Sequence, residues 1–353
     1  RTPLERRGDL RAQEAANHIG SRRALELYSA GSSDHLNGLN NALLDYAEKR
    51  MRSLLSTLPD GEFSFSDCIE TGDPDSPFVE IPVVIRLRGD SAEVDFTNAP
   101  AALPNSLNAV RAITVAAVFY VFQCLGENAV PANSGMLRPI TISTKPGTLC
   151  DASYPSAVSA GNVETSQRLV DVLFGALAQA CPDKVPAASG GSMNNILFGG
   201  TYPDKTSFVH YETLACGSGG GPSGKGADAI QIHMTNTLNT PVEAVERDFP
   251  VRIVRYALRD KASNDTPGIH PGGRGVCREY QFLQTTEVTI ISERRAKQPY
   301  GLNGAPAGQL GRNWIKRNNN PPQLLGGKAT LLLEANDCLI IETPCGGAYQ
   351  PPE

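Results

Sequence analysis

The sequence predicts a mixed α+β fold, and three changes in its hydrophobic pattern carry this prediction. A helical period covers the first 58 residues, a period of two follows as far as residue 97, and alternating segments return after residue 250. Glycine-rich loops and two further helical segments lie between. We therefore expect an N-terminal helical hairpin over residues 1–58, a central mixed α/β core over 59–249, and a strand-rich C-terminal subdomain over 250–353.

The first 58 residues predict two helices. Apolar residues recur every three or four positions on both sides of a turn at residues 30–33, and Pro59-Asp60-Gly61 ends the second helix. The chain begins with Arg1, which is neither an initiator methionine nor part of a targeting segment. We therefore expect the natural chain to continue upstream.

The central core predicts strands first and helices later. Strands are expected at residues 62–65, 78–85 and 92–97, with a hairpin turn at 88–91. Helices are expected at about 107–125 and 165–181, the second capped near Asn162 and ended by Pro182. After residue 250, alternation predicts strands at 251–258 and 287–291, and a hairpin around Asn336 that joins 328–333 to 338–342.

Composition excludes several classes of function. Of the 353 residues, 40% are hydrophobic and 20% charged, which is typical of a globular protein. A net charge of -5 and few aromatic residues argue against a general affinity for nucleic acid or anionic lipid. No apolar run has the length of a membrane span. We expect a cytoplasmic protein that binds neither nucleic acid nor membrane.

The cysteines and histidines give no metal-binding pattern. None of the eight cysteines forms a CxxC pair, and the histidines show no HxxxH or HExxH spacing. We expect reduced thiols and no metal site within this chain alone. Cys216 lies beside glycines but has no base next to it in the sequence, so it is interpreted as an inert thiol.

Glycines and polar residues alternate between residues 160 and 240, which is typical of an active-site lining. Residues 219–226 fit the pattern GxxxxGK, but Gly226 stands where a phosphate-binding loop carries Ser or Thr. The segment after Lys225 also alternates like a strand, whereas a phosphate loop precedes a helix. We therefore expect a glycine-rich pocket loop here, not a nucleotide site.

The start of the helix at residue 165 has two interpretations. In the first, Asn162 caps the helix and Glu164 complements the dipole of its first turn. In the second, the helix start holds an anionic or carbonyl group that Glu164 or Arg168 orients. Asp171 is expected to support Arg168 through a pair on the same helix face.

Two more segments hold candidate residues. His233 lies between apolar neighbours, so it is either a satisfied strand histidine or a general acid or base, with Glu212 opposite it. Asn194 and Asn195 follow a Ser-Gly-Gly turn and are expected to form an oxyanion or carboxylate pocket. Asn236 belongs to a stretch dense in hydrogen-bonding side chains.

Taken together, these segments resemble the hydantoinase B/5-oxoprolinase family in order and spacing along the chain. The motifs include MNN at 193–195, YET at 211–213, GGRGV at 272–276 and ETPCGG at 342–347. The other segments that carry the resemblance are residues 6–13, 108–112, 161–168, 233–241 with Glu243, and 293–295.

The resemblance implies ATP-dependent opening of a cyclic amide, such as 5-oxoproline or N-methylhydantoin. A kinase-like A-type partner would phosphorylate the amide oxygen, and this B-type chain would complete hydrolysis within an oligomer. ATP and a divalent metal are implied for the full complex and none within this chain, because in the carboxylase relatives an upstream segment binds the metal. The alternatives are a subunit of an acetone- or acetophenone-type carboxylase and a non-catalytic remnant that binds its partner.

Within this interpretation, Glu164 or Glu212 activates water, and His233 polarises the carbonyl or holds its oxyanion. The residues expected to bind substrate share a polar side chain that can hydrogen-bond to it: Asn162, Arg168, Asn194, Asn195 and Asn236.

Overall fold

The computed structural model describes residues 3–126, 131–260, 269–317 and 320–351. Its helical elements are α1 (Pro3–Ala30), α2 (Ser33–Leu55), α3 (Arg111–Cys124), the 3-10 turn η1 (Ser134–Leu137), the π-helical turn η2 (Gly161–Thr165), α4 (Ser166–Leu177) and α5 (Val242–Asp248). Its strands are β1 (Gly61–Glu70), β2 (Phe78–Arg88), β3 (Ser91–Asp95), β4 (Ile140–Ser143), β5 (Asn195–Thr201), β6 (Ser207–Thr213), β7 (Val251–Leu258), β8 (Val276–Phe282), β9 (Thr286–Ile291), β10 (Arg312–Lys316), β11 (Gln323–Leu325), β12 (Lys328–Leu333) and β13 (Cys338–Glu342). The predicted α+β class is confirmed.

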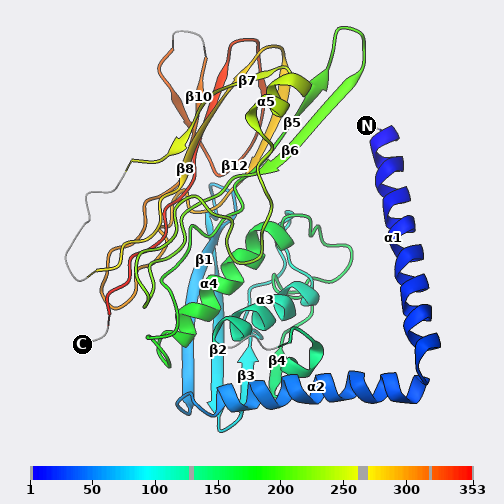
Figure 1. The fold of residues 1–353 in the computed structure, drawn as a ribbon. Coiled ribbons are helices and arrows are strands. Elements are labelled where there is room, and N and C mark those ends of the chain that lie inside the picture. Colours follow the sequence, from blue (N-terminus) through cyan, green and yellow to red (C-terminus); the bar gives the residue numbers. More distant parts are fainter. Residues whose placement is uncertain (1–2, 127–130, 261–268, 318–319, 352–353) are drawn as a thin grey trace.

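Two helices open the fold, but α1 and α2 meet at a corner instead of lying antiparallel as a hairpin (Figure 1). The Ser32 hydroxyl caps α2 by accepting a hydrogen bond from His35 N at 3.2 Å. Ala47, Met51 and Leu55 repeat every four residues on the buried face of α2. In α1, every side chain whose burial is described is exposed. None of the helices in these four ranges combines the length and apolar character needed to cross a membrane.

The first sheet has the strand order β1-β2-β3-β4, with β3 and β4 parallel and the other pairs antiparallel. Arg88 pairs with Ser91, which confirms the predicted turn between β2 and β3. Alternate residues of β2, from Ile81 to Leu87, are buried in a core that also takes in side chains of α3 and α4. Helix α4 is buried along its whole length, and it positions the residues described below.

The start of α4 differs from the sequence prediction. The chain first makes the π-helical turn η2, and neither η2 nor α4 has a side-chain cap. Asn162 is exposed and caps nothing. The physical reason is close backbone contact, because a Cβ on Gly161 would lie 2.0 Å from the carbonyl oxygen of Asn108.

The other two sheets share one core. Their strand orders are β11-β10-β13-β8-β7 and β12-β9-β5-β6. Phe198 on β5 contacts Tyr280 and Phe282 on β8, with ring centroids 6.2 and 5.7 Å apart. Strands β5 and β6 come from the segment before residue 250, yet β5 pairs with β9 from the segment after it.

The predicted hairpin between residues 328–333 and 338–342 is wrong. Strand β12 pairs with β9, whereas β13 pairs with β8 and β10 in the other sheet. The chain therefore crosses between the sheets at residues 334–337. Leu333 and Leu339 enter the same core cluster from the two sheets, so the crossing buries both side chains between the sheets.

Extended segments at residues 186–191, 217–227, 270–275, 299–309 and 343–349 pack side by side, and we call them the glycine bundle (Figure 1). Their backbones hydrogen-bond in several directions: Ala187 N donates to Gly220 O, Gly220 N to Gly347 O, and Gly347 N to Ala188 O. A Cβ on Gly219 would lie 1.9 Å from the oxygen of Ala187. As in collagen, only glycine fits where backbones approach so closely.

The bundle changes the interpretation of the glycine-rich loops. Beside Gly217, Gly219, Gly220 and Gly226, the space that a ligand would need is filled by neighbouring backbone. The predicted alternation at residues 229–234 forms no strand either, since Ile230 makes a single bridge to Cys216 and His233 has a left-handed φ of 51°. Backbone packing therefore accounts for these four glycines, whereas a Cβ on Gly224 would meet nothing within 4 Å.

Candidate functional site

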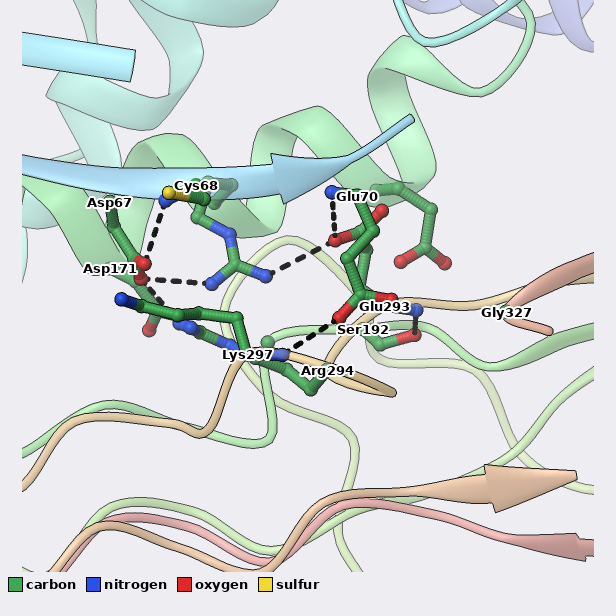
Figure 2. Close-up of polar contacts among 12 residues, drawn as sticks. Asp67, Cys68, Glu70, Asp171, Ser192, Glu293, Arg294, Lys297 and Gly327 are labelled. Carbon is green, nitrogen blue, oxygen red and sulfur yellow. Dashed lines mark hydrogen bonds and ion pairs between the residues drawn. The ribbon is translucent and has the colours of Figure 1, made fainter. Parts of the chain in front are cut away.

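A buried ion-pair network lies where β1, α4 and residues 292–295 meet (Figure 2). Its centre is Asp67 Oδ2, which accepts from Arg168 Nη1 at 2.9 Å and from Arg294 Nη2 at 2.7 Å. The side chains of Asp67, Arg168 and Arg294 are at most 4% exposed. Burial opposes ionisation of Asp67, but the charges of Arg294 and Arg168 outweigh it and hold its pKa well below the usual range.

One end of the network is Asp171, on α4. Arg294 Nη2 donates to Asp171 Oδ2 at 2.9 Å, and the Ser189 hydroxyl donates to Oδ1 at 3.2 Å. The expected pairing of Asp171 with Arg168 is thus replaced by a pairing with Arg294. Burial opposes the charge of Asp171, but His233 and Arg294 prevail and lower its pKa.

The other end of the network is Glu293. Its Oε2 accepts from the backbone N of Glu70 at 3.0 Å and lies 3.5 Å from Arg168 Nη2. The ammonium of Lys328 donates to Oε1 of Glu293 and, at 3.2 Å, to Ser292 O. Three positive and three negative side chains therefore alternate through the interior, as buried charges require.

Glu164 is fully buried next to this network. Its Oε1 accepts from Asn195 Nδ2 at 2.6 Å and from Met193 N at 3.2 Å. The Tyr211 hydroxyl donates to the other end of the Asn195 amide at 2.7 Å. Burial, assisted by the negative charge of Glu293, raises the pKa of Glu164 to about 8. Most of this carboxyl is therefore protonated at neutral pH.

His233 lies near the Asp171 end of the network. Its Nε2 is 3.5 Å from Asp171 Oδ1, and its Nδ1 is 3.3 Å from the Tyr120 hydroxyl. Its ring also contacts those of Tyr120 and Phe174. The His233 ring thus lies between the Asp171 carboxylate and the Tyr120 hydroxyl.

Glu212 belongs to a different cluster, inside the core of the paired sheets. It accepts from the Tyr280 hydroxyl at 2.6 Å and from Asn239 Nδ2 at 3.2 Å, and its Oε1 lies 3.2 Å from Arg278 Nη2. Burial opposes its ionisation, but His210, Arg278 and Tyr280 outweigh burial and lower its pKa. The structure does not bring Glu212 opposite His233.

The remaining predicted residues are divided between the interior and the surface. Asn194 is buried, and its Oδ1 accepts from Arg295 Nη1 at 3.0 Å. Arg168 and Asn195 lie in or beside the network, as described. Asn162 and Asn236 are exposed, and neither joins the network. The structure thus gathers Glu164, Arg168, Asn194 and Asn195, with His233 at the far end.

A cavity of about 330 Å³ opens beside Glu164. Glu164 is fully buried and does not line the cavity, whereas Leu107 and Ile291 do. The carbonyl oxygens of Leu107 and Ile291 accept from Thr165, which follows Glu164 in the chain, and from Asn195, which donates to Glu164. Lys328 reaches from the cavity wall to Glu293. The lining residues are Thr71, Asn105, Ser106, Leu107, Thr289, Ile290, Ile291, Lys328, Ala329 and Thr330.

Sequence reasoning missed the roles of Asp67, Glu293, Arg294 and Lys328. Residues 293–295 stood out only through the family resemblance, and no charge pattern pointed to Lys328. The pattern of β1 contains a signal for Asp67, because this residue takes a buried position in a strand whose exposed and less exposed residues alternate. A charged residue at such a position needs a partner, and here the partners lie 101 and 227 residues away.

The described residues include neither a cluster of metal ligands nor a phosphate cradle at residues 219–226. Within the described ranges, no three His, Cys, Asp or Glu side chains are grouped to hold a metal ion. In the GxxxxGK segment, the amides of Gly220 and Gly226 donate to the carbonyl oxygens of Gly347 and Pro271, and Lys225 pairs with Asp228 at 2.9 Å. These amides are thus committed to the glycine bundle and do not form a phosphate cradle.

Comparisons with known proteins find named relatives that match nearly the whole chain. It is 36% identical to a 5-oxoprolinase of Dictyostelium discoideum, over 97% of this chain and 26% of that protein. It is 31% identical to a protein of Pseudomonas sp. named as the B-type component of a D-/L-hydantoinase, over 98% of this chain and 60% of the relative. The chain therefore spans about a quarter of the length of the first relative and 60% of the second.

A solved structure shares the fold. The ATP-dependent caprolactamase of Pseudomonas jessenii superposes with a TM-score of 0.84 at 23% identity, over 98% of this chain and 61% of that one. The sequence profile of Hydantoinase B/oxoprolinase matches residues 1–352. Since this match covers nearly every residue, the chain belongs to the hydantoinase B/oxoprolinase family.

Proposed function

We propose that this chain is the B-type part of an ATP-dependent amidohydrolase that opens a cyclic amide. Its membership of the family and its likeness to a 5-oxoprolinase and a hydantoinase component support the reaction class. The observation that carries the proposal is Glu164, a carboxyl whose pKa is raised to about 8 and whose Oε1 is held by Asn195. A group poised near neutral pH suits proton transfer to and from an amide.

An unactivated amide is a poor electrophile. We infer that a kinase-like A-type partner, with ATP, phosphorylates the amide oxygen and so supplies the electrophile. The residues of this chain then position a water molecule and move its proton. Because the partner binds ATP in this scheme, the GxxxxGK segment of this chain does not need to bind a nucleotide.

In the proposed step, Leu107 and Ile291 move aside to admit water from the cavity, and ionised Glu164 takes a proton from this water while the water oxygen forms a bond to the activated ring carbon. Glu164 returns this proton to the ring nitrogen, and the C–N bond breaks as the remaining proton of the attacking water also passes to the nitrogen. The acyl phosphate that is left is hydrolysed by a second water to a carboxylate and inorganic phosphate. Glu164 Oε2 has no hydrogen-bond partner among the described residues, so one lone pair can accept the proton of the attacking water. Tyr211 orients the Asn195 amide, which fixes the carboxyl through Oε1.

The test is ring opening of 5-oxoproline by the complete complex with an A-type partner and ATP. Glu164→Gln should lower kcat by about 10²–10⁴-fold while the complex still assembles. In the wild type, kcat/KM should rise with pH through about 8, because Glu164 must lose its proton to act as a base. Unchanged turnover in the variant would remove Glu164 from the mechanism.

The same assay separates the alternatives. A carboxylase would consume ATP only with bicarbonate and a ketone. A non-catalytic remnant would assemble with its partner and leave the rate of ring opening unchanged.

A further inference from the structure

Lys328 is the charged residue of the cavity beside Glu164. Of the ten described lining residues, the other nine are uncharged, and the polar ones are Thr71, Asn105, Ser106, Thr289 and Thr330. The cavity volume of about 330 Å³ suits a small ring compound. Its walls therefore offer hydrogen bonds together with one positive charge.

The Lys328 ammonium has one more N–H donor than it uses within the described residues. It has three N–H groups, of which one donates to Glu293 and one to Ser292 O. Glu293 is also bonded by Glu70 N and lies near Arg168, so it does not depend on Lys328 alone. The remaining donor can bind a ligand without leaving Glu293 uncompensated.

The stem of Lys328 is held in place. Gly72 has a left-handed φ of 80°, and a Cβ there would lie 3.1 Å from Lys328 Cδ. Thr330, on the same strand as Lys328, and Thr289, on the neighbouring strand β9, hydrogen-bond to each other through their hydroxyls at 3.0 Å. A cation fixed in a cavity of hydroxyl and amide groups is suited to a carboxylate.

We propose that this cavity binds the carboxylate of a carboxylated lactam, with Lys328 as the residue that selects acidic over neutral rings. This inference deepens the proposed function and rests on it for the identity of the ring. It predicts that the chain prefers a ring acid to the same lactam without its carboxyl group. The ring amide would then face the wall formed by Leu107 and Ile291, behind which Glu164 lies.

The experiment is direct binding to the chain, without ATP or partner, measured by calorimetry with L-5-oxoproline and 2-pyrrolidinone. The acid should bind at least about tenfold more tightly than the neutral lactam. Lys328→Met should weaken binding of the acid by roughly 10- to 100-fold and leave 2-pyrrolidinone unchanged. Lys328→Arg should retain most of the preference, because it keeps the charge.

Two control variants test whether a change in ligand binding arises at this cavity. Lys316→Met removes an equal charge from an exposed site on β10 and should not alter binding. Thr330→Trp fills the cavity and should abolish binding of the acid. Thermal unfolding of each variant shows whether a loss of binding is merely a loss of fold, and the charge-retaining variant decides the question if Lys328→Met does not fold.

Equal binding of the two lactams, no binding of the acid, or full binding by Lys328→Met would overturn the inference. Failure of the proposed function looks different: the acid still binds through Lys328, but the complete complex opens no ring. If Lys328→Met opens the ring at the wild-type rate, the proposed function is retained and the carboxylate site at Lys328 is refuted.

Discussion

Asn195 and Glu164, 31 residues apart in the chain, meet with 2.6 Å between Asn195 Nδ2 and Glu164 Oε1. The bond joins the first residue of β5 to the turn that precedes α4. It holds a carboxyl whose pKa is raised by burial. The consequences of this pairing can be measured in the folded chain without any substrate.

The first prediction concerns stability and pH. The folded pKa of Glu164, about 8, exceeds its ordinary value of 4.5, so the folded state binds more protons between these limits. The stability that Glu164 confers is therefore complete below pH 4.5 and is lost as the pH rises through 8. Glu164→Gln should become more stable relative to the wild type with increasing pH in urea unfolding at pH 5, 7 and 9. Parallel curves for the two proteins would contradict the raised pKa.

The second prediction concerns the ion-pair network. Arg294→Met should destabilise the fold by about 3–5 kcal/mol, because it leaves Asp67 and Asp171 buried with fewer partners. Arg247→Met is the control, since Arg247 and Asp248 form an exposed pair and its loss should change little. Chemical unfolding of both variants at one pH gives the comparison. Equal small effects would mean that the network contributes nothing to stability.

The third prediction concerns the glycine bundle. Gly219→Ala should cost about 3 kcal/mol or more, because its methyl group would clash with backbone that cannot move aside. Gly38→Ala is the same substitution in α2, where a Cβ has open space around it. It should therefore raise the free energy of unfolding by about 0.5–1 kcal/mol. Melting temperatures that fall in Gly219→Ala and rise in Gly38→Ala would support the close backbone packing of the glycine bundle. A neutral Gly219→Ala would exclude the close packing.

The fourth prediction separates the two candidate carboxylates. Glu212→Gln should destabilise the chain, because Arg278 is fully buried and loses its charged partner. It should not move the pH profile of ring opening in the complete complex, whereas Glu164→Gln should remove its inflection. A flattened profile in Glu212→Gln would reverse these roles.

The sequence could predict much of the fold because periodicity reports which residues face the core. The turn at residues 88–91, the N-terminal helices and strands 251–258 and 287–291 all follow from local pattern. Local pattern failed where long-range packing decides. Strands β12 and β13 are neighbours in the chain but partners in different sheets, and the alternation after Lys225 is overridden by the glycine bundle.

The candidate site was predicted in part. Glu164, Asn194, Asn195 and Arg168 were expected to line one pocket; all four are buried in or beside the network, and their role in a site stays a prediction. Asn162 and Asn236 belonged to equally polar stretches, yet they lie on the surface, because polarity alone does not distinguish a buried hydrogen bond from a hydrated one. Asp67 could be placed only once β1 was known to lie against α4.

The glycine bundle also sets the order in which the protein can be completed. Residues 344–349 hydrogen-bond to Gly217, Gly273, Ala188 and His270, which were all made earlier in synthesis. Ser189 and Asn194, which border the network, continue directly from one of these bundle segments. The ribosome must therefore release most of the chain before the interior that holds Glu164 can close. Such late, non-local closure makes slow folding, and exposure to aggregation on the way, a built-in property of this architecture.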